Sequence, residues 1–401
     1  MNTNQHFLAK QQARRAFMQH LGLAALSIPT LGSIGLQGCS SGSKSDSSDT
    51  GADSADTANG TATRKLGIAL VGLGLYSEGE LAPALQETQY CTLSGIVTGT
   101  PEKAEKWKQK YNILPANVYN YENFDQIANN PAIDIVYVVL PNLLHADFVV
   151  RAAKAGKHVI CEKPMATTTA DAERMIAACK AADRQLSVGY RLHFDPYNRE
   201  MMRLGQGQVF GSVKQLVAEH GQKQENDTPW RLQKGAGPLR DVGIYALQGA
   251  IYTKGQIPVS VTAKFHPVTD REKFSEVEEG LDFQLQFADG SVADCKTSYN
   301  DKFNKLRAEA SKGWFQLDPA FAYRGLKGET SEGKMDIEKV NQQARQMDAF
   351  AQCLLNDTPT TVPGELGLRD VQLIEAIFEA ARTGKKVDTS RVSQVMGTKM
   401  A

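Results

Sequence analysis

The sequence lacks the cysteine and histidine patterns that identify disulfide scaffolds and metal centres. Its six cysteines include no Cys-x-x-Cys pair, and its seven histidines form no His-Glu-x-x-His or other metal-ligand spacing. If Cys39 belongs to a lipidation motif, as argued below, five cysteines remain, so at least one thiol stays unpaired. We therefore expect neither a disulfide framework nor a metal site.

The sequence also lacks an excess of charge of either sign. Lys+Arg and Asp+Glu number 45 each, which excludes the overall basic field of a typical nucleic-acid-binding protein. The hydrophobic fraction, 41%, is ordinary for a globular protein. A chain of 401 residues is long enough for two domains with sizeable cores, so we expect two domains and no nucleic-acid partner.

The first 39 residues have the pattern of an export signal. Arg14 and Arg15, followed by Phe17, precede an apolar run over residues 21–36. Paired arginines before an apolar run of this length indicate export rather than a membrane span. The pair resembles the twin-arginine motif, which directs export of folded proteins. LQGC resembles a lipobox, in which Cys39 would be lipidated and become the first residue of the mature chain. These features predict a periplasmic lipoprotein whose only contact with the membrane is its lipid anchor.

Residues 40–63 have the composition of a tether. They are almost entirely Ser, Asp, Thr, Gly and Ala. Such a segment cannot bury enough apolar surface to offset its ordering entropy, so it is predicted to be disordered. As a random coil it would have a root-mean-square reach of roughly 25–30 Å.

A dinucleotide-binding turn is indicated directly after the tether. A strand predicted over Leu66–Val71 is followed by GLGLYS, in which Gly72, Gly74 and Ser77 form a GxGxx[GAS] pattern before an amphipathic helix. Glycine is needed because the turn is tight and the backbone must approach a pyrophosphate. The helix N-terminus then supplies free N–H groups and a positive dipole end. The alternative is a plain βα turn, which the strand–turn–helix context disfavours.

The next strand, predicted over Cys91–Gly99, should end where the ribose of the nucleotide is recognised. NAD enzymes usually present Asp or Glu at this position to bind the 2′-hydroxyl. Here no carboxylate lies directly at the strand end, whereas Thr98 and Lys103 lie within reach. This combination suits a 2′-phosphate, so NADP is preferred over NAD. Lys103 is equally consistent with a solvated lysine on a helix face.

A lysine is predicted at the same edge of the sheet. The apolar run Ile133–Leu140 is typical of a strand covered on both faces and ends in PNLLH. A further strand, HVIC, ends at Cys161, and Glu-Lys-Pro follows immediately. Ligands of open α/β sheets bind outside the carboxyl ends of the strands, so Lys163 should lie beside the glycine turn. The alternative is a strand-end lysine whose ammonium extends into solvent.

These motifs together resemble the glucose–fructose oxidoreductase / inositol dehydrogenase family, most closely its glucose–fructose oxidoreductase members. The resemblance covers nearly everything from Arg64 to Val387 and implies a two-domain α/β protein. Its first domain, 64–187, would be a Rossmann-type doubly wound parallel sheet that binds the dinucleotide. Its second, 188–387, would be an α+β substrate and oligomerisation domain with a large, mostly antiparallel open sheet, followed by a tail, 388–401. The segments that carry the resemblance are VGLGLYS, LPNLLHADFVVRAAKAGKHVICEKPMA, VGYRLHFDPYN, WRL, DVGIYALQGAIY and PGELGLRDVQLIEAIFEAARTGKKV.

The resemblance also implies the site residues. Tyr245 would be the general acid/base at the sugar oxygen and Lys163 would hold that oxygen, with Asp241 one helical turn from Tyr245. Arg191 would contact the substrate or make a structural contact. The loop LQKGAGPLRD departs from the family pattern, being shorter and carrying Arg240 in place of an apolar residue, so the sugar is left open. The implied cofactor-binding residues are Gly72, Gly74, Ser77, Thr98, Lys103, Pro141, Asn142, His145, Glu162, Trp230 and Arg231.

Four functions are consistent with these features. The favoured one is a periplasmic, NADP-containing oxidoreductase that oxidises aldoses, with the retained cofactor reset by a second sugar, because the periplasm has no supply of nicotinamide cofactor. The second is a sugar dehydrogenase with exchangeable cofactor. The third is a non-catalytic sugar or cofactor sensor on the same fold. The last passes a hydride out and back during glycoside cleavage or epimerisation. The resemblance implies sugar substrates and a homo-oligomer formed through the C-terminal sheet.

Overall fold

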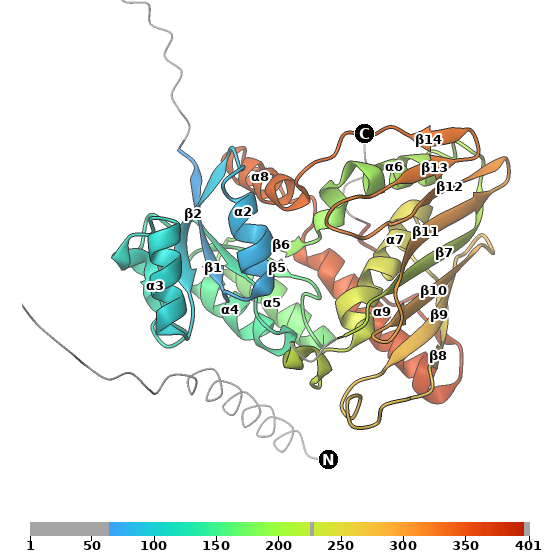
Figure 1. The fold of residues 1–401 in the computed structure, drawn as a ribbon, viewed down its shortest axis with the longest axis horizontal. Coiled ribbons are helices and arrows are strands. Elements are labelled where there is room, and N and C mark those ends of the chain that lie inside the picture. The colour runs from blue at the N-terminus through green and yellow to red at the C-terminus, as the bar shows by residue number, and fades with distance from the viewer. Residues whose placement is uncertain (1–63, 225–227, 397–401) are drawn as a thin grey trace, which may run out of the picture. The chain divides into compact units, whose positions relative to one another are not determined.

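A computed structural model describes residues 64–224 and 228–396 of the chain. The predicted signal, lipobox and tether, residues 1–63, lie outside the described residues, as does the end of the tail, 397–401. Residues 65–396 belong to one compact unit that contains two sheets (Figure 1). No helix within the described ranges is long and apolar enough to cross a membrane.

The first sheet has six parallel strands in the order β3-β2-β1-β4-β5-β6, which is the doubly wound order of dinucleotide-binding domains. The central strands are buried on both faces, which explains their near-continuous apolar sequences. The predicted Rossmann-type sheet is confirmed. The strands are β1 (Leu66–Val71), β2 (Cys91–Val97), β3 (Val118–Tyr119), β4 (Ile135–Val138), β5 (His158–Glu162) and β6 (Leu186–Gly189).

Short helices connect these strands. Where the chain enters α5, the Thr168 hydroxyl accepts a hydrogen bond from Asp171 N at 3.2 Å and caps the helix. The connecting helices are η1 (Ser77–Leu81), α2 (Ala82–Ala84), α3 (Pro101–Lys110), η2 (Pro115–Asn117), η3 (Phe124–Asn129), η4 (Asn142–Leu144), α4 (His145–Lys154) and α5 (Thr169–Ala181).

The second sheet has nine strands in the order β14-β13-β12-β11-β7-β10-β9-β8-β15. All neighbours pair antiparallel except β7 and β10, so the predicted, mostly antiparallel sheet is confirmed. The turn ADGS, residues 288–291, joins β9 to β10. The strands are β7 (Val213–Gly221), β8 (Ser260–Phe265), β9 (Gly280–Gln286), β10 (Val292–Ser298), β11 (Phe303–Ala310), β12 (Gly313–Leu317), β13 (Gly328–Thr330), β14 (Gly333–Met335) and β15 (Val387–Asp388).

Helices cover one face of the second sheet, as Figure 1 shows for α6, α7 and α9. Helix α7 is capped by Gly255 and α9 by Gly384, both in the left-handed conformation that glycine adopts at low cost. The helices of this half of the chain are η5 (Arg191–Phe194), α6 (Pro196–Gln206), η6 (Pro229–Leu232), η7 (Leu239–Gly243), α7 (Ile244–Lys254), α8 (Gln342–Leu355) and α9 (Gly364–Thr383).

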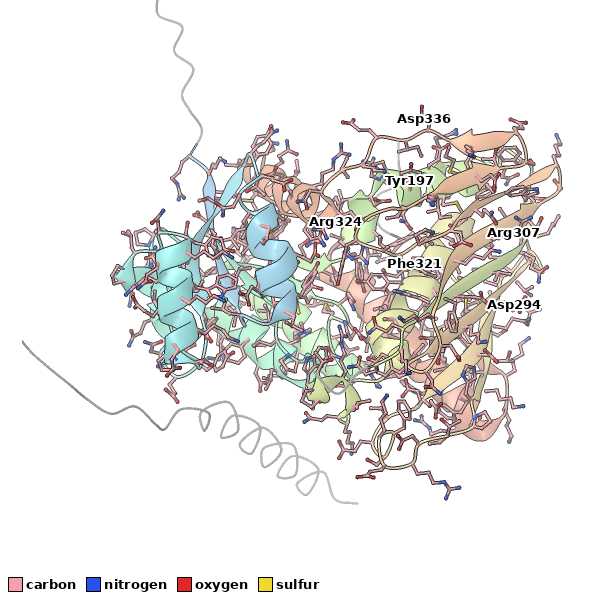
Figure 2. The ribbon with its side chains drawn as sticks, viewed as in Figure 1. Tyr197, Asp294, Arg307, Phe321, Arg324 and Asp336 are labelled. Carbon is pink, nitrogen blue, oxygen red and sulfur yellow. The ribbon has the colours of Figure 1, made fainter. Side chains whose placement is uncertain are left out.

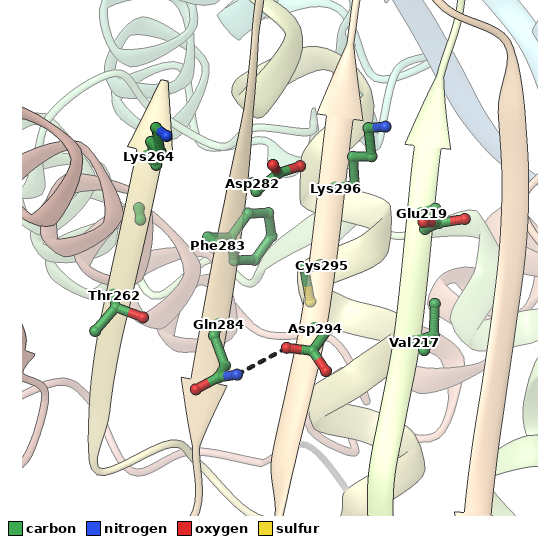
Figure 3. A pocket seen from close by; sticks show the side chains of 11 residues that line it. Val217, Glu219, Thr262, Lys264, Asp282, Phe283, Gln284, Asp294, Cys295 and Lys296 are labelled. Carbon is green, nitrogen blue, oxygen red and sulfur yellow. Dashed lines mark hydrogen bonds between the residues drawn. The ribbon is translucent and has the colours of Figure 1, made fainter. Parts of the chain in front are cut away.

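The other face of this sheet carries polar side chains. Residues of β7 to β10 alternate between apolar side chains under the helices and polar ones outside, including Lys264, Asp282 and Lys296 (Figure 3). They line a shallow hollow of about 530 Å³. Because the strands alternate, this hollow lies on the face away from α7.

Helix α8 does not follow the expected domain division. The boundary at residue 187 assigns it to the second domain, but its buried residues Met347 and Phe350 belong to the same core as Ile68 and Leu70 of β1. The Asp348 carboxylate also accepts hydrogen bonds from the backbone N–H groups that precede β2, at 2.9–3.0 Å. The first sheet is therefore completed by a segment from near the C-terminus.

The cysteines of the described residues are all free. Cys91, Cys161, Cys179 and Cys295 are buried, and Cys353 is half-buried. Burial raises the pKa of the Cys179 thiol to about 12, so this thiol stays protonated at neutral pH.

Candidate active site

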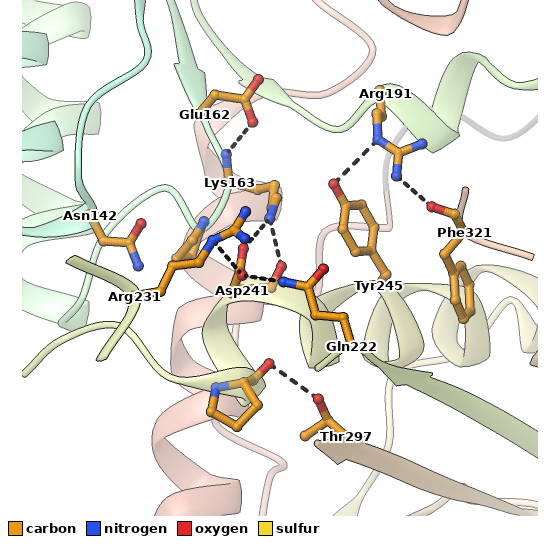
Figure 4. Close-up of polar contacts among 12 residues, drawn as sticks. Asn142, Glu162, Lys163, Arg191, Gln222, Arg231, Asp241, Tyr245, Thr297 and Phe321 are labelled. Carbon is orange, nitrogen blue, oxygen red and sulfur yellow. Dashed lines mark hydrogen bonds and ion pairs between the residues drawn. The ribbon is translucent and has the colours of Figure 1, made fainter. Parts of the chain in front are cut away.

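Four elements bring charged and aromatic side chains together at the carboxyl edge of the first sheet (Figure 4). Lys163 follows β5, Asp241 lies in η7, Tyr245 lies in the first turn of α7, and Arg191 opens η5 after β6. Because β5 and β6 are neighbouring parallel strands, their ends deliver Lys163 and Arg191 to the same edge.

Lys163 is paired rather than solvated. Its Nζ donates to the Asp241 carbonyl oxygen at 2.6 Å and lies 3.3 Å from Asp241 Oδ1. Only 12% of its side chain is exposed. Burial lowers the pKa of the Lys163 ammonium, but the nearby Tyr245 and Asp241 side chains outweigh burial and raise it. The lysine is therefore a fixed cation at this edge, and the alternative of a lysine extending into solvent does not describe its position.

Asp241 is the negative centre of the cluster. Its Oδ2 accepts from the Tyr299 hydroxyl at 2.8 Å and from Gln222 Nε2 at 3.4 Å, and lies 3.1 Å from Arg231 Nε. Burial raises the pKa of the Asp241 carboxyl, but Arg231 and Lys163 outweigh it, so the pKa falls below its usual range. The carboxylate stays ionised and fixes both cations.

Tyr245 is packed between charged and aromatic groups. Lys163 Nζ lies 4.8 Å from the centre of its ring, and the Arg191 guanidinium lies at the same distance. Arg191 Nε donates to the Tyr245 hydroxyl at 3.3 Å. The rings of His220 and Phe321 contact it at centroid distances of 5.4 and 6.3 Å. Two cations therefore lie beside one phenol ring.

Glu162 supports the lysine from inside the first sheet. It is buried, and its Oε1 accepts from the Tyr137 hydroxyl at 2.6 Å, which in turn accepts from Gln346 Nε2 of α8 at 2.7 Å. Its Oε2 accepts from the backbone N of Lys163 at 3.2 Å. Burial raises the pKa of Glu162, opposed by Tyr137 and Lys163. Glu162 thus connects α8 to the backbone that carries the lysine.

The glycine turn has the geometry of a phosphate-binding loop. Gly72 has φ +93°, and a Cβ there would lie 2.3 Å from the Val139 carbonyl oxygen. Ser77 Oγ donates to the Gly72 carbonyl at 2.6 Å and closes the turn. At Gly74 a Cβ would meet nothing within 4 Å. The first glycine is therefore required by the fold, while the second leaves open space over the turn where a pyrophosphate fits.

This difference predicts different effects of two alanine substitutions. Gly72→Ala should lower the free energy of unfolding by more than about 1 kcal/mol, because its φ and the Val139 carbonyl both oppose a side chain. Gly74→Ala should leave unfolding unchanged but weaken nucleotide binding, because the methyl group fills the open space over the turn. Urea unfolding and nucleotide titration of both variants test this, and equal unfolding free energies for the two would contradict it.

The residues expected near the adenosine and nicotinamide lie as follows. Thr98 is buried at the end of β2, where its hydroxyl accepts from Thr100 N at 3.3 Å. Lys103 is half-buried in the first turn of α3. Asn142 Nδ2, directly after Pro141, donates to the Gly235 carbonyl at 3.2 Å. The cofactor-binding roles expected for these residues stay predictions.

Trp230 and Arg231 lie in η6, with the guanidinium 5.6 Å from the indole. Arg231 reaches the reaction centre through Asp241. Arg240, which departs from the family pattern, lies 4.6 Å from the centre of the Phe378 ring and donates to the Thr167 carbonyl at 3.5 Å.

His145 has a different setting from the one expected of a cofactor ligand. Its side chain is fully buried, with Nδ1 3.0 Å from the Pro164 carbonyl and Nε2 2.6 Å from the Leu140 carbonyl. Burial lowers its pKa. The ring holds the loop after β4 against the loop that carries Lys163, so the geometry supports a positioning role, and direct cofactor contact stays a prediction.

Several residues of the cluster were not singled out from the sequence. His220 lies in β7 and Gln222 directly follows it, Tyr299 follows β10, and Tyr323 follows β12. Nothing in the sequence around them marks a site, because the pairing of the second sheet brings them to α7. The only available signal was the alternation of β7, which places His220 on the same face as Leu216 and Ala218.

Within 64–224 and 228–396 no group of three His, Cys, Asp or Glu side chains is arranged to hold a metal ion. Lys163 and Arg231 are instead paired with the Asp241 carboxylate. What the site offers is a fixed cation, a phenol and a nucleotide-binding turn at one edge.

Comparison with known proteins agrees with this arrangement. Residues 66–190 match the oxidoreductase family, NAD-binding Rossmann fold. Residues 198–316 match the GFO/IDH/MocA C-terminal domain, and residues 328–389 match the oxidoreductase family, C-terminal alpha/beta domain. These matches span both sheets.

Individual relatives extend over most of the chain. The crystal structure of aldose-aldose oxidoreductase from Caulobacter crescentus complexed with glycerol is similar with a TM-score of 0.79 and 42% identity, covering 81% of this chain and 100% of that one. D-xylose 1-dehydrogenase [NADP(+)] from Haloarcula marismortui is 30% identical, with 80% of this chain and 92% of that protein covered. D-glucoside 3-dehydrogenase from Escherichia coli is 25% identical, with 80% and 97% covered.

The doubly wound sheet with its glycine turn, the second open sheet and these similarities over nearly full length lead to one assignment. The chain is an oxidoreductase with an NAD(P)-binding Rossmann domain and belongs to the GFO/IDH/MocA family.

Proposed function

We propose that the protein is a periplasmic, NADP-containing oxidoreductase that transfers hydride to and from sugars. The observation that carries the proposal is the pairing of Lys163 with Tyr245: an ammonium lies 4.8 Å from the centre of a phenol ring. Both lie at the sheet edge that also carries the glycine turn. The similarity to an aldose-aldose oxidoreductase and a D-xylose 1-dehydrogenase supports aldoses as the substrates.

Oxidation of an aldose at C1 breaks the C1–H and O–H bonds and gives a lactone. Bound NADP⁺ supplies the acceptor for the hydride. Tyr245 takes the hydroxyl proton in its phenolate form and becomes a neutral phenol. Lys163 donates a hydrogen bond to the reacting oxygen and stabilises the charge that develops there, and Arg191 stabilises the Tyr245 oxygen during proton transfer. In the reverse direction Tyr245 returns the proton to a carbonyl oxygen.

NADP is proposed over NAD because no carboxylate lies directly at the end of β2. Thr98 and Lys103 occupy the region in which NAD enzymes place an acidic residue. The similarity to a D-xylose 1-dehydrogenase whose name specifies NADP(+) supports the same preference.

The location of the protein determines how the cofactor is used. The paired arginines and the LQGC stretch support export of the folded protein and anchoring through Cys39. An exported enzyme that keeps its NADP needs a second sugar to reoxidise it. Comparing membrane fractions of cells that express the wild-type chain or Cys39→Ser tests the anchor, and equal distribution of both proteins would exclude it.

The first test of the function is the cofactor content of the purified protein. We expect protein purified without added nucleotide to release NADP(H) on denaturation, close to one per chain. Adding an aldose should reduce it once, and a second sugar should reoxidise it. An empty site, or NAD alone, would contradict the proposal. Turnover sustained by free NADP would instead support a dehydrogenase with exchangeable cofactor.

We also propose a homo-oligomer formed through the second sheet. The polar outer face carries charges of both signs on neighbouring strands, such as Lys264 opposite Asp282, so two copies can meet with complementary charges. Sedimentation of wild-type and Lys296→Glu protein measures this. A monomer in the wild-type protein would exclude it.

A further inference from the structure

A segment between β12 and β13, residues 318–327, leaves the second sheet and reaches the first domain; we call it the strap. Figure 2 shows Arg324 of the strap between the two sheets, whereas Arg307 and Asp294 lie on the outer face of the second sheet. The base of the strap is fixed by Asn304, whose Oδ1 accepts from the backbone N of Ala320 at 2.8 Å and of Phe321 at 2.7 Å.

Arg191 holds the strap against the reaction centre. Its Nη2 donates to the Phe321 carbonyl at 2.6 Å and its Nη1 to the Ala322 carbonyl at 3.3 Å. The same guanidinium lies 4.4 Å from the centre of the Tyr323 ring and 4.8 Å from that of Tyr245. Tyr323 therefore contacts the same cation as the proposed acid/base residue.

Tyr323 is fixed but remains accessible. Its ring stacks on Tyr76 of the glycine turn, with centroids 5.7 Å apart and an interplanar angle of 27°. Even so, 40% of the residue is exposed, which is unusual for an aromatic side chain held by two neighbours. Its hydroxyl makes no hydrogen bond to any part of the chain that the structure describes. Such a ring offers an apolar face and a free hydroxyl, the combination that binds a partner with both C–H and O–H groups.

The strap is also tied to the first domain by charge. Arg324 Nη1 and Nη2 donate to Glu80 Oε1 and Oε2, each at 3.0 Å, in a two-point pair. Glu80 lies in η1, the helix that begins at Ser77 of the glycine turn. The strap thus joins the element beside the nucleotide to the element beside Tyr245.

We propose that the strap forms one wall of the sugar site, with Tyr323 as a specificity-determining residue. This inference rests on the proposed function. A pyranose or furanose whose reacting carbon lies at Tyr245 would contact the Tyr323 ring through its C–H groups and the Tyr323 hydroxyl through one of its own. The Arg324–Glu80 pair anchors this wall in place.

The test separates sugar binding from chemistry. The single reduction of bound NADP is followed at increasing D-glucose or D-xylose, giving a half-saturating concentration and a limiting rate for each variant. Tyr323→Ala should raise the half-saturating concentration about 10-fold or more, because a shaped contact is lost. Tyr323→Phe, which keeps the ring, should raise it about 2- to 10-fold. Both should keep the limiting rate and the NADP content, and Lys327→Ala, an exposed change in the same strap, should alter none of these quantities.

A charge exchange tests the anchor. Arg324→Glu and Glu80→Arg should each raise the half-saturating concentration about 2- to 5-fold, and the double variant should restore it. Failure of the double variant to recover would remove the anchoring role.

Calorimetric titration with D-glucose and D-xylose runs in parallel. An unchanged half-saturating concentration in Tyr323→Ala overturns the inference, as does a fall in the limiting rate alone or a loss of NADP. Sugar binding that weakens in Tyr323→Ala while the wild-type protein transfers no hydride supports the wall and removes the proposed reaction. Absence of sugar binding by the wild-type protein overturns both.

Discussion

Replacing Lys163 by alanine should reduce turnover on the order of 10²-fold or more, the effect of losing a positioned charged donor at the reacting oxygen. The cost to folding should be limited, because Asp241 keeps Arg231 and Tyr299 as partners. Turnover is measured as the steady-state rate with two sugars, and the NADP content and thermal unfolding of the variant are measured beside it.

Two controls make this result specific to Lys163. Lys180→Ala removes a lysine of α5 whose side chain is 70% exposed and which pairs with Glu365 of α9, so its turnover should match the wild type. Lys163→Met retains the length of the side chain and should be as inactive as the alanine variant. Turnover near the wild-type value in Lys163→Ala would show that the ammonium stabilises only the fold.

Tyr245→Phe should reduce both half-reactions about 10²- to 10⁴-fold, the usual contribution of acid/base catalysis. The substitution keeps the ring between Arg191, Lys163 and Phe321 and removes only the hydroxyl. Stability should therefore change little. The rates to measure are those of NADP reduction by an aldose and reoxidation by a second sugar, since one residue performs both proton transfers.

Tyr252→Phe is the matched control, because Tyr252 is a buried tyrosine of the same helix, two turns after Tyr245. Its turnover should equal that of the wild type. A Tyr245→Phe variant that slows only one half-reaction would point to a second acid/base group. A variant that slows neither would leave Tyr245 a packing residue.

Much of the first domain could be predicted from the sequence because its signals are local. The strand Leu66–Val71 and the glycine turn were predicted as the structure has them. The β4 strand, Ile135–Val138, is shorter than the apolar run that predicted it, since apolar residues continue into the turns at both ends.

The site was only partly predictable because some of its contacts join residues that are far apart in the sequence. Lys163 and Tyr245 belong to motifs, and the order of the parallel strands brings Lys163 to the carboxyl edge of the first sheet. Arg324 and Glu80 are 244 residues apart, and no pattern in either segment indicates the other. Their contact depends on how the nine strands of the second sheet pair. One of these pairs, β7 with β10, is parallel, and the alternation of side chains along the strands does not specify it.

The position of α8 has a consequence for the order in which the parts of the chain fold. Ile68 and Leu70 are among the first described residues, but Met347 and Phe350 complete their core. The nucleotide-binding half therefore cannot close its interior during synthesis until the chain has been made beyond residue 351. Until then, its apolar strands lack part of the surface that covers them in the folded protein. The interior of this half should therefore close late in folding, after α8 has formed and packed against β1.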